Sequence, residues 1–147
     1  MNKAKHRNIR RELLSRYGRV VSWHASISVR ADRPRGLPPW RETHASIQLE
    51  GEFTEAVAGV ARFLIQVSPK DKPDLGNTAI PNIGAFIAVK PELQGVVDMT
   101  EGEFQRLLTL AASDRLAWIF VAFTTPLRRS ALITSIDFST RAPDDEA

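Results

Sequence analysis

Cysteine is absent from the 147-residue chain, and this one absence excludes several classes of protein. Without a thiol there is no disulfide, thiolate metal site, iron–sulfur cluster or cysteine nucleophile. Long apolar runs are missing as well, since a block such as residues 116–123 has the length of a strand and not that of a membrane span. The first residues are basic but lead into no apolar segment, so we expect neither a secretory signal nor a membrane anchor there. The default expectation is a cytoplasmic protein.

Familiar catalytic and nucleotide-binding strings are missing too. The chain has no G-x-S-x-G, no H-E-x-x-H, no P-loop and no G-x-G-x-x-G, and only three histidines are available as bases. We therefore predict no cofactor and no metal, and we favour a protein that is not an enzyme.

Positive charge is concentrated at the start of the chain. Residues 1–41 contain eleven lysines and arginines against two acidic residues, a balance of +9, whereas residues 42–147 contain nine against fifteen, a balance of −6. This asymmetry predicts an anionic partner for the N-terminal part, either an acidic protein surface or a nucleic acid. It also fits self-association, with the basic part of one subunit on the acidic part of another.

Two stretches, 19–29 and 43–53, alternate apolar and polar residues with the period of a β-strand. Each has one apolar face and one polar face that we expect to be exposed to solvent. The first places Val21, Trp23, Ile27 and Val29 together on its apolar face. The two strands are expected to pair as a hairpin centred near Gly36, with the loop 30–42 at its tip.

Further strands are predicted at 60–67, 83–89, 94–99, 116–124 and 130–139, with a long loop at 68–82. Residues 53–64 also fit a helical spacing, but the alternation continues into Val67 and favours a strand there. One helix is well specified at about 101–113, because Thr100 and Glu103 form a capping-box pair before an apolar stripe. A second, short and basic helix over 3–17, or else a flexible arm, fits the spacing of Ile9, Leu13 and Tyr17.

These elements predict a mostly-β fold, either an antiparallel β-sandwich or a curled sheet of six to seven strands with one internal helix closing one end. We divide the chain into a basic N-terminal helix or arm (1–18), a single mostly-β domain (19–140) and a disordered acidic tail (141–147).

His24 and His44 are the candidates for a catalytic pair, since imidazole titrates near neutrality. In a hairpin centred near Gly36, however, His24 would face Gln48 and His44 would face Ser28. Four residue pairs at about 3.4 Å each would separate the two rings by roughly 13 Å, too far to share a proton or a metal.

The basic arm and the loop 30–42 are the stronger candidates for binding. The loop joins arginines and Trp40, which are residue types that often dominate interface energies, to prolines that reduce the entropy lost on docking. Trp40 could equally fold back to cover the end of the sheet. The expected partner-binding residues are Arg7, Arg10, Arg11, Arg30, Arg33, Arg35, Trp40 and Arg41.

Three functions remain open. The favoured one is a small interaction protein that contacts an acidic partner, either another protein or its own subunit. The alternatives are an accessory nucleic-acid-binding protein that reads backbone charge, and a metal-independent nuclease or other hydrolase that uses His24 and His44.

Overall fold

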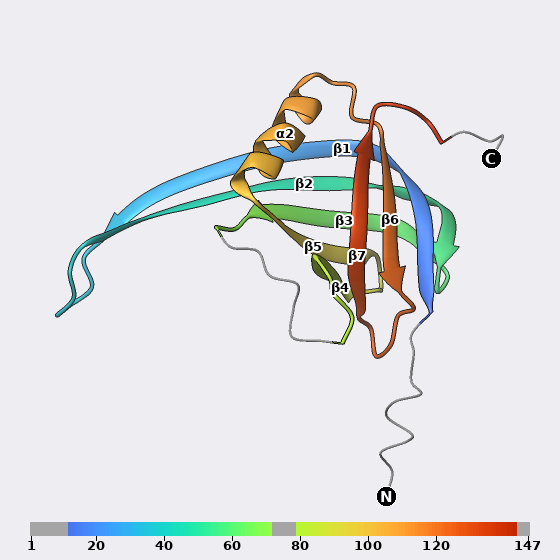
Figure 1. Cartoon of the computed structure of the whole chain (residues 1–147), viewed down its shortest axis with the longest axis horizontal. Coiled ribbons are helices and arrows are strands. Elements are labelled where there is room, and N and C mark those ends of the chain that lie inside the picture. The colour runs from blue at the N-terminus through green and yellow to red at the C-terminus, as the bar shows by residue number, and fades with distance from the viewer. Residues whose placement is uncertain (1–11, 72–78, 144–147) are drawn as a thin grey trace, which may run out of the picture.

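The computed structural model describes residues 12–71 and 79–143, and these form one helix and seven strands (Figure 1). The strands close into a barrel in the order β1-β2-β3-β5-β4-β7-β6. The elements are β1 (Leu13–Asp32), β2 (Trp40–Val57), β3 (Val60–Pro69), β4 (Gly84–Ala88), β5 (Leu93–Met99), α2 (Glu101–Ala112), β6 (Trp118–Thr124) and β7 (Ala131–Ser139).

The mostly-β class with one internal helix is confirmed, whereas the sheet forms a closed barrel and not an open sandwich. Closure follows because β1 pairs with β2 along one side and with β6 along the other. Residues 53–64 are extended, apart from the turn into β3, as the alternation predicted. The pair β3–β5 is parallel, an arrangement that was not predicted from the sequence.

Phenylalanine rings fill the middle of the barrel. The ring centroids of Phe53 and Phe63 lie 4.7 Å apart, and those of Phe86 and Phe123 lie 5.2 Å apart. Phe63, Phe86 and Phe123 are at most 1% exposed. Burial of each such ring stabilises the fold by about 1.5–3 kcal/mol, so this cluster is a main source of stability.

The predicted basic helix over 3–17 is wrong where the structure describes it, since Leu13–Tyr17 belongs to β1. Leu13–Arg19 pairs with β6 in register from Thr124 to Trp118, and this ladder satisfies the backbone groups that a helix would have satisfied internally. The Tyr17 ring packs 4.5 Å from that of Phe120. Residues 1–11 lie outside the described parts of the chain, and with them the expected binding residues Arg7, Arg10 and Arg11.

A register shift at Val21 changes which residues of β1 face the core. Val20 pairs with Gly51 and Ser22 with Glu50, so Val21 is the extra residue of a β-bulge and is 71% exposed. The simple alternation predicted that Val21 and Trp23 share a face. The bulge separates them, so this prediction is wrong for Val21.

Helix α2 covers one end of the barrel beside β3 and β5 (Figure 1). Its predicted capping box is confirmed: the Glu103 amide donates to Thr100 Oγ1 at 3.2 Å, and the Thr100 amide donates to Glu103 Oε1 at 2.9 Å. Phe104, Leu107 and Ala111 form the buried face. In the described residues no helix is long and apolar enough to cross a membrane.

Candidate functional site

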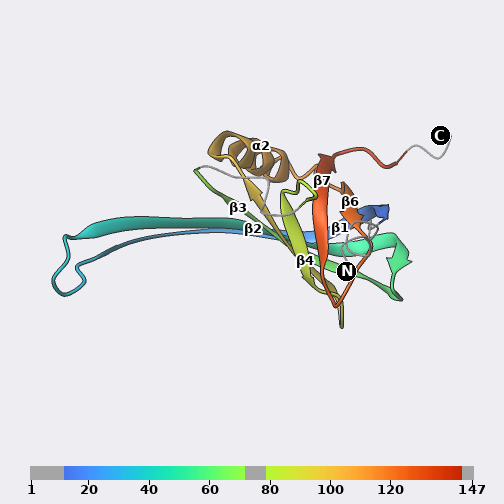
Figure 2. The same ribbon diagram turned by 60° about the horizontal axis from the view of Figure 1, so that its bottom comes forward.

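The most conspicuous feature of the molecule is a two-stranded arm that projects from the barrel, formed by residues 24–46 (Figure 2). Strand β3 follows β2 only as far as Ile47, and β6 follows β1 only as far as Arg19. Beyond these points β1 and β2 pair with each other alone. The arm ends in the loop 33–39.

The predicted hairpin and its register are confirmed. Ser28 pairs with His44 and His24 with Gln48, and the last pair before the loop is Asp32 with Trp40. Asp32 Oδ1 accepts a hydrogen bond of 2.7 Å from the Arg33 amide, and within the loop the Leu37 amide donates to the Pro34 carbonyl oxygen at 3.1 Å. Gly36 has a φ of +76°, a conformation that suits glycine at the apex of a turn.

The two histidines do not come together. Four residue pairs separate them along the arm. At about 3.4 Å per residue, the distance between the two histidines is greater than a hydrogen bond or a bridging water can span. His44 contacts Glu42 on its own strand instead. Among the described residues no group of three or more His, Asp or Glu side chains could hold a metal ion.

Trp40 lies at the outer end of the arm and not over the barrel. It is half-buried, and the guanidinium carbon of Arg30 lies 5.7 Å from the centre of its ring. Cation–π contact of this kind contributes about 0.5–1 kcal/mol at an exposed site. The indole is therefore covered by an arginine of the arm, and the loop is not a cover for the end of the sheet.

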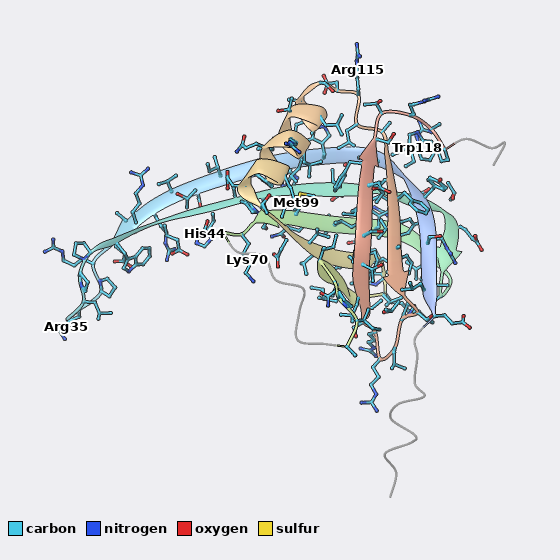
Figure 3. The ribbon with its side chains drawn as sticks, in the orientation of Figure 1. Arg35, His44, Lys70, Met99, Arg115 and Trp118 are labelled. Atoms are coloured by element: carbon cyan, nitrogen blue, oxygen red, sulfur yellow. The ribbon has the colours of Figure 1, made fainter. Side chains whose placement is uncertain are left out.

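Four arginines follow the outer part of the arm: Arg30, Arg33, Arg35 and Arg41, all of them exposed. Figure 3 shows Arg35 at the far end, with His44 closer to the barrel. Within the described parts of the chain none of the four forms an ion pair with a carboxylate. Their charge is thus available to a partner.

The apolar face of the arm is open to solvent. Ile27 is 70% exposed, Val29 50% and Leu37, in the tip loop, 62%. The alternation of Ile27 and Val29 suggested a strand with a covered face. This expectation is wrong, because no second layer packs on the outer arm.

A groove of about 480 Å³ separates this face from α2. Its apolar floor includes Ile27 and Ala45 of the arm, and Phe104 and Leu108 of the helix. The carboxylates of Asp71 and Glu101 are among the polar groups that line it. The groove thus joins apolar surface to negative charge at the base of the arm.

The arm tip and the start of the described chain lie at opposite ends of β1. The described chain starts at Glu12, whose carbonyl oxygen accepts a hydrogen bond of 2.8 Å from the Thr125 amide. Strand β1 then runs for 20 residues before the tip loop begins. At about 3.3 Å per residue, this length separates the arm tip from Glu12.

Comparison of the chain with protein-family models, with curated proteins and with solved structures finds no match. The interpretation of the site therefore depends on its geometry.

Sequence reasoning found the hairpin, its register and its arginines, but it missed the projection of the hairpin from the barrel, the groove, and the exposure of Ile27 and Val29. Neither the exposure nor the groove has a signal in the local pattern. The exposure depends on the absence of a covering layer, and the groove forms between residues about 60–80 positions apart in the chain.

Proposed function

We propose that this protein is a non-enzymatic interaction protein and that the tip of its arm binds an acidic surface on a partner protein. The observation that carries the proposal is the set of four exposed arginines around Trp40, none of which forms an ion pair with another described residue, on a ribbon that lies outside the barrel core.

An isolated two-stranded ribbon is marginally stable in water, so an arm of this length gains from being covered. Its side chains contribute little to the barrel, because every residue from His24 to Arg33 is exposed. Contact with another molecule would therefore stabilise the ribbon.

The arginines suit carboxylates. A guanidinium offers a planar fork of donors that matches a carboxylate in two parallel hydrogen bonds. The guanidinium carbon of Arg30 lies 5.7 Å from the centre of the Trp40 ring, and no carboxylate of the described residues forms an ion pair with this arginine. Arg and Trp are also enriched among the residues that dominate interface energies.

A protein fits this surface better than a nucleic acid does. Asp32 and Glu42 interrupt the arginines of the arm, and they would repel a continuous row of phosphates. The exposed side chains of Ile27, Val29 and Leu37 add apolar contact area, which a protein partner can bury.

The test uses fluorescently labelled poly-L-glutamate as an acidic probe, with labelled duplex DNA and single-stranded RNA in parallel. We expect the wild type to bind polyglutamate more tightly than either nucleic acid, and to lose affinity as salt is raised. The variant Arg33→Glu/Arg35→Glu is expected to bind at least about tenfold more weakly, a loss of about 1.4 kcal/mol.

A matched control carries the same charge change at the other end of the barrel. Arg128→Glu/Arg129→Glu alters the turn between β6 and β7, and it is expected to bind the probe nearly as the wild type does. Equal losses in the two variants would show that net charge and not the arm determines binding. Tighter binding of the nucleic acids would contradict the proposal and support the alternative, an accessory nucleic-acid-binding protein.

A further inference from the structure

The outer side of β1 is a long free sheet edge. The Val20 amide donates a 2.8 Å hydrogen bond to the Ala117 carbonyl, and beyond this point no described strand pairs along that side of β1. The free edge runs from Val21 to Asp32. It contains neither proline nor lysine, the residues that commonly protect an edge from pairing with another chain.

We propose that this edge pairs antiparallel with the same edge of a second copy, about a two-fold axis at Val29. Each Val29 then faces its symmetry mate, and Ser26–Asp32 of one subunit pairs with Asp32–Ser26 of the other. The product is a four-stranded ribbon that holds two barrels together. Because one edge of each subunit is used, the assembly closes as a dimer and does not grow into a fibre.

The side chains of the edge are compatible with this register. Residues directly opposite each other share a face, so Ala31 meets Ile27 of the second copy and the apolar faces of both arms combine. Arg30 meets Ser28, and Asp32 meets Ser26. No two like charges stand directly opposite.

The length of the free edge favours an axis at Val29. With this register the apex of the tip, Gly36, reaches the level of Ser22 on the second copy. It stops short of Val20, where Ala117 occupies the edge. An axis at Ile27 would pair more residues but would drive the seven-residue loop 33–39 into the start of β6.

Charge at the two ends of the contact is complementary. In the same register Arg33 lies level with Ala25 of the second copy, which lines the groove beside α2. Asp71 and Glu101 line that groove too, and the basic tip of one arm thus approaches the acidic groove of the other subunit. The two-fold axis places two such contacts in the dimer.

This inference extends the proposed function, because it names a second copy as an occupant of the same arm. The two remain separable, since dimerisation is measured on the protein alone and the acidic probe is absent. A protein that binds polyglutamate through its tip but never dimerises would leave the proposed function standing and overturn this inference.

The first measurement is the mass of the full chain by light scattering after gel filtration, from micromolar to submillimolar concentration. We expect twice the chain mass of 16.4 kDa at the upper end. Val29→Lys places two ammonium groups face to face on the axis and is expected to weaken the dimer at least about tenfold. A mass of one chain at every concentration overturns the inference.

His44→Lys is the matched control. It adds one positive charge at an exposed position of β2, one residue pair from Val29, but on the strand whose outer edge the proposed dimer does not use. Circular dichroism verifies that both variants are folded. A dimer that responds equally to the two substitutions, or to neither, places the contact elsewhere and contradicts the β1 pairing.

The absence of cysteine gives an independent readout of the register. Val29→Cys introduces the only thiol of the chain and sets it against its own symmetry mate, so mild oxidation with oxidised glutathione is expected to yield a covalent dimer. His44→Cys is expected to stay uncrosslinked under the same conditions. Equal crosslinking of the two variants would indicate random collision and overturn the proposed register.

Discussion

Gly51 of β2 lies close to the backbone of β1 and to the phenylalanine core. A Cβ atom at this position would lie 1.9 Å from the carbonyl oxygen of Arg19 and 2.7 Å from the Phe63 ring. The first of these contacts is with backbone, which cannot rotate away. A side chain as small as methyl would therefore force the two strands apart next to the buried phenylalanines.

Replacement of Gly51 by alanine is expected to lower the free energy of unfolding by about 1–3 kcal/mol or more, as overpacking in a core does. Urea-induced unfolding followed by tryptophan fluorescence measures the change. Gly102 is the control, because nothing lies within 4 Å of its Cβ position and it belongs to helix α2. Gly102→Ala is expected to be neutral or to stabilise by up to about 1 kcal/mol, and similar effects at both sites would contradict this account.

Single residues also show where the alternation of the sequence stops predicting burial. Val21 and Trp23 have the spacing of one face, but the bulge at Val21 puts the valine in solvent. A bulge leaves no sign in a binary pattern. The alternation places Ile27 on the apolar face, as for a core position. Its exposure depends on the absence of a covering layer, and no local pattern predicts that absence.

At the scale of elements, the features that depend on near neighbours were predictable. The capping box of α2 and the register of the β1–β2 hairpin are both set by residues close in the chain or by the symmetry of one loop. Closure of the barrel was not predictable in this way, since it pairs Leu13 with Thr124 across most of the sequence. The parallel pairing of β3 with β5 likewise follows from the whole topology and not from either strand.

Helix α2 provides a test of how much its local signature contributes. Thr100→Ala removes the acceptor for the Glu103 amide and leaves one end of the reciprocal pair, so a loss of about 1 kcal/mol of stability is expected. Thr109→Ala is the control, because Thr109 Oγ1 donates only to the Gln105 carbonyl oxygen within the helix. Alanine has the higher helix propensity there, and thermal unfolding should show no loss. Equal destabilisation by both changes would show that the cap has no special role.

At the scale of the whole molecule, the barrel and the arm are formed by different parts of the same two strands, β1 and β2. The inner parts of β1 and β2 close the barrel around Phe53 and Phe63, and the outer parts carry arginines, an apolar face and a free edge into solvent. An exposed edge of this kind is ordinarily a risk for aggregation. Its persistence on the arm is consistent with an edge that pairs in a defined way.

The register of the hairpin allows the arm to be removed without disturbing the barrel. Ile27 pairs with Ala45, so deletion of residues 28–44 and insertion of Asn-Gly joins these two residues by the two-residue turn that a hairpin prefers. The barrel core and the groove side chains Ile27 and Ala45 are retained. We expect the shortened protein to fold with a free energy of unfolding within about 1 kcal/mol of the wild type, because the deleted side chains bury little surface.

The same deletion removes the arginine tip and Val29 together, so it is expected to abolish both polyglutamate binding and dimerisation while the circular dichroism spectrum stays that of a β protein. The Val29→Lys variant separates the two activities, since it should lose the dimer and keep the probe. An arm-deleted protein that still dimerises would assign self-association to the barrel. A deletion that unfolds the protein would show instead that the arm is part of the fold, because its pairing would then be needed to hold β1 and β2 in the barrel.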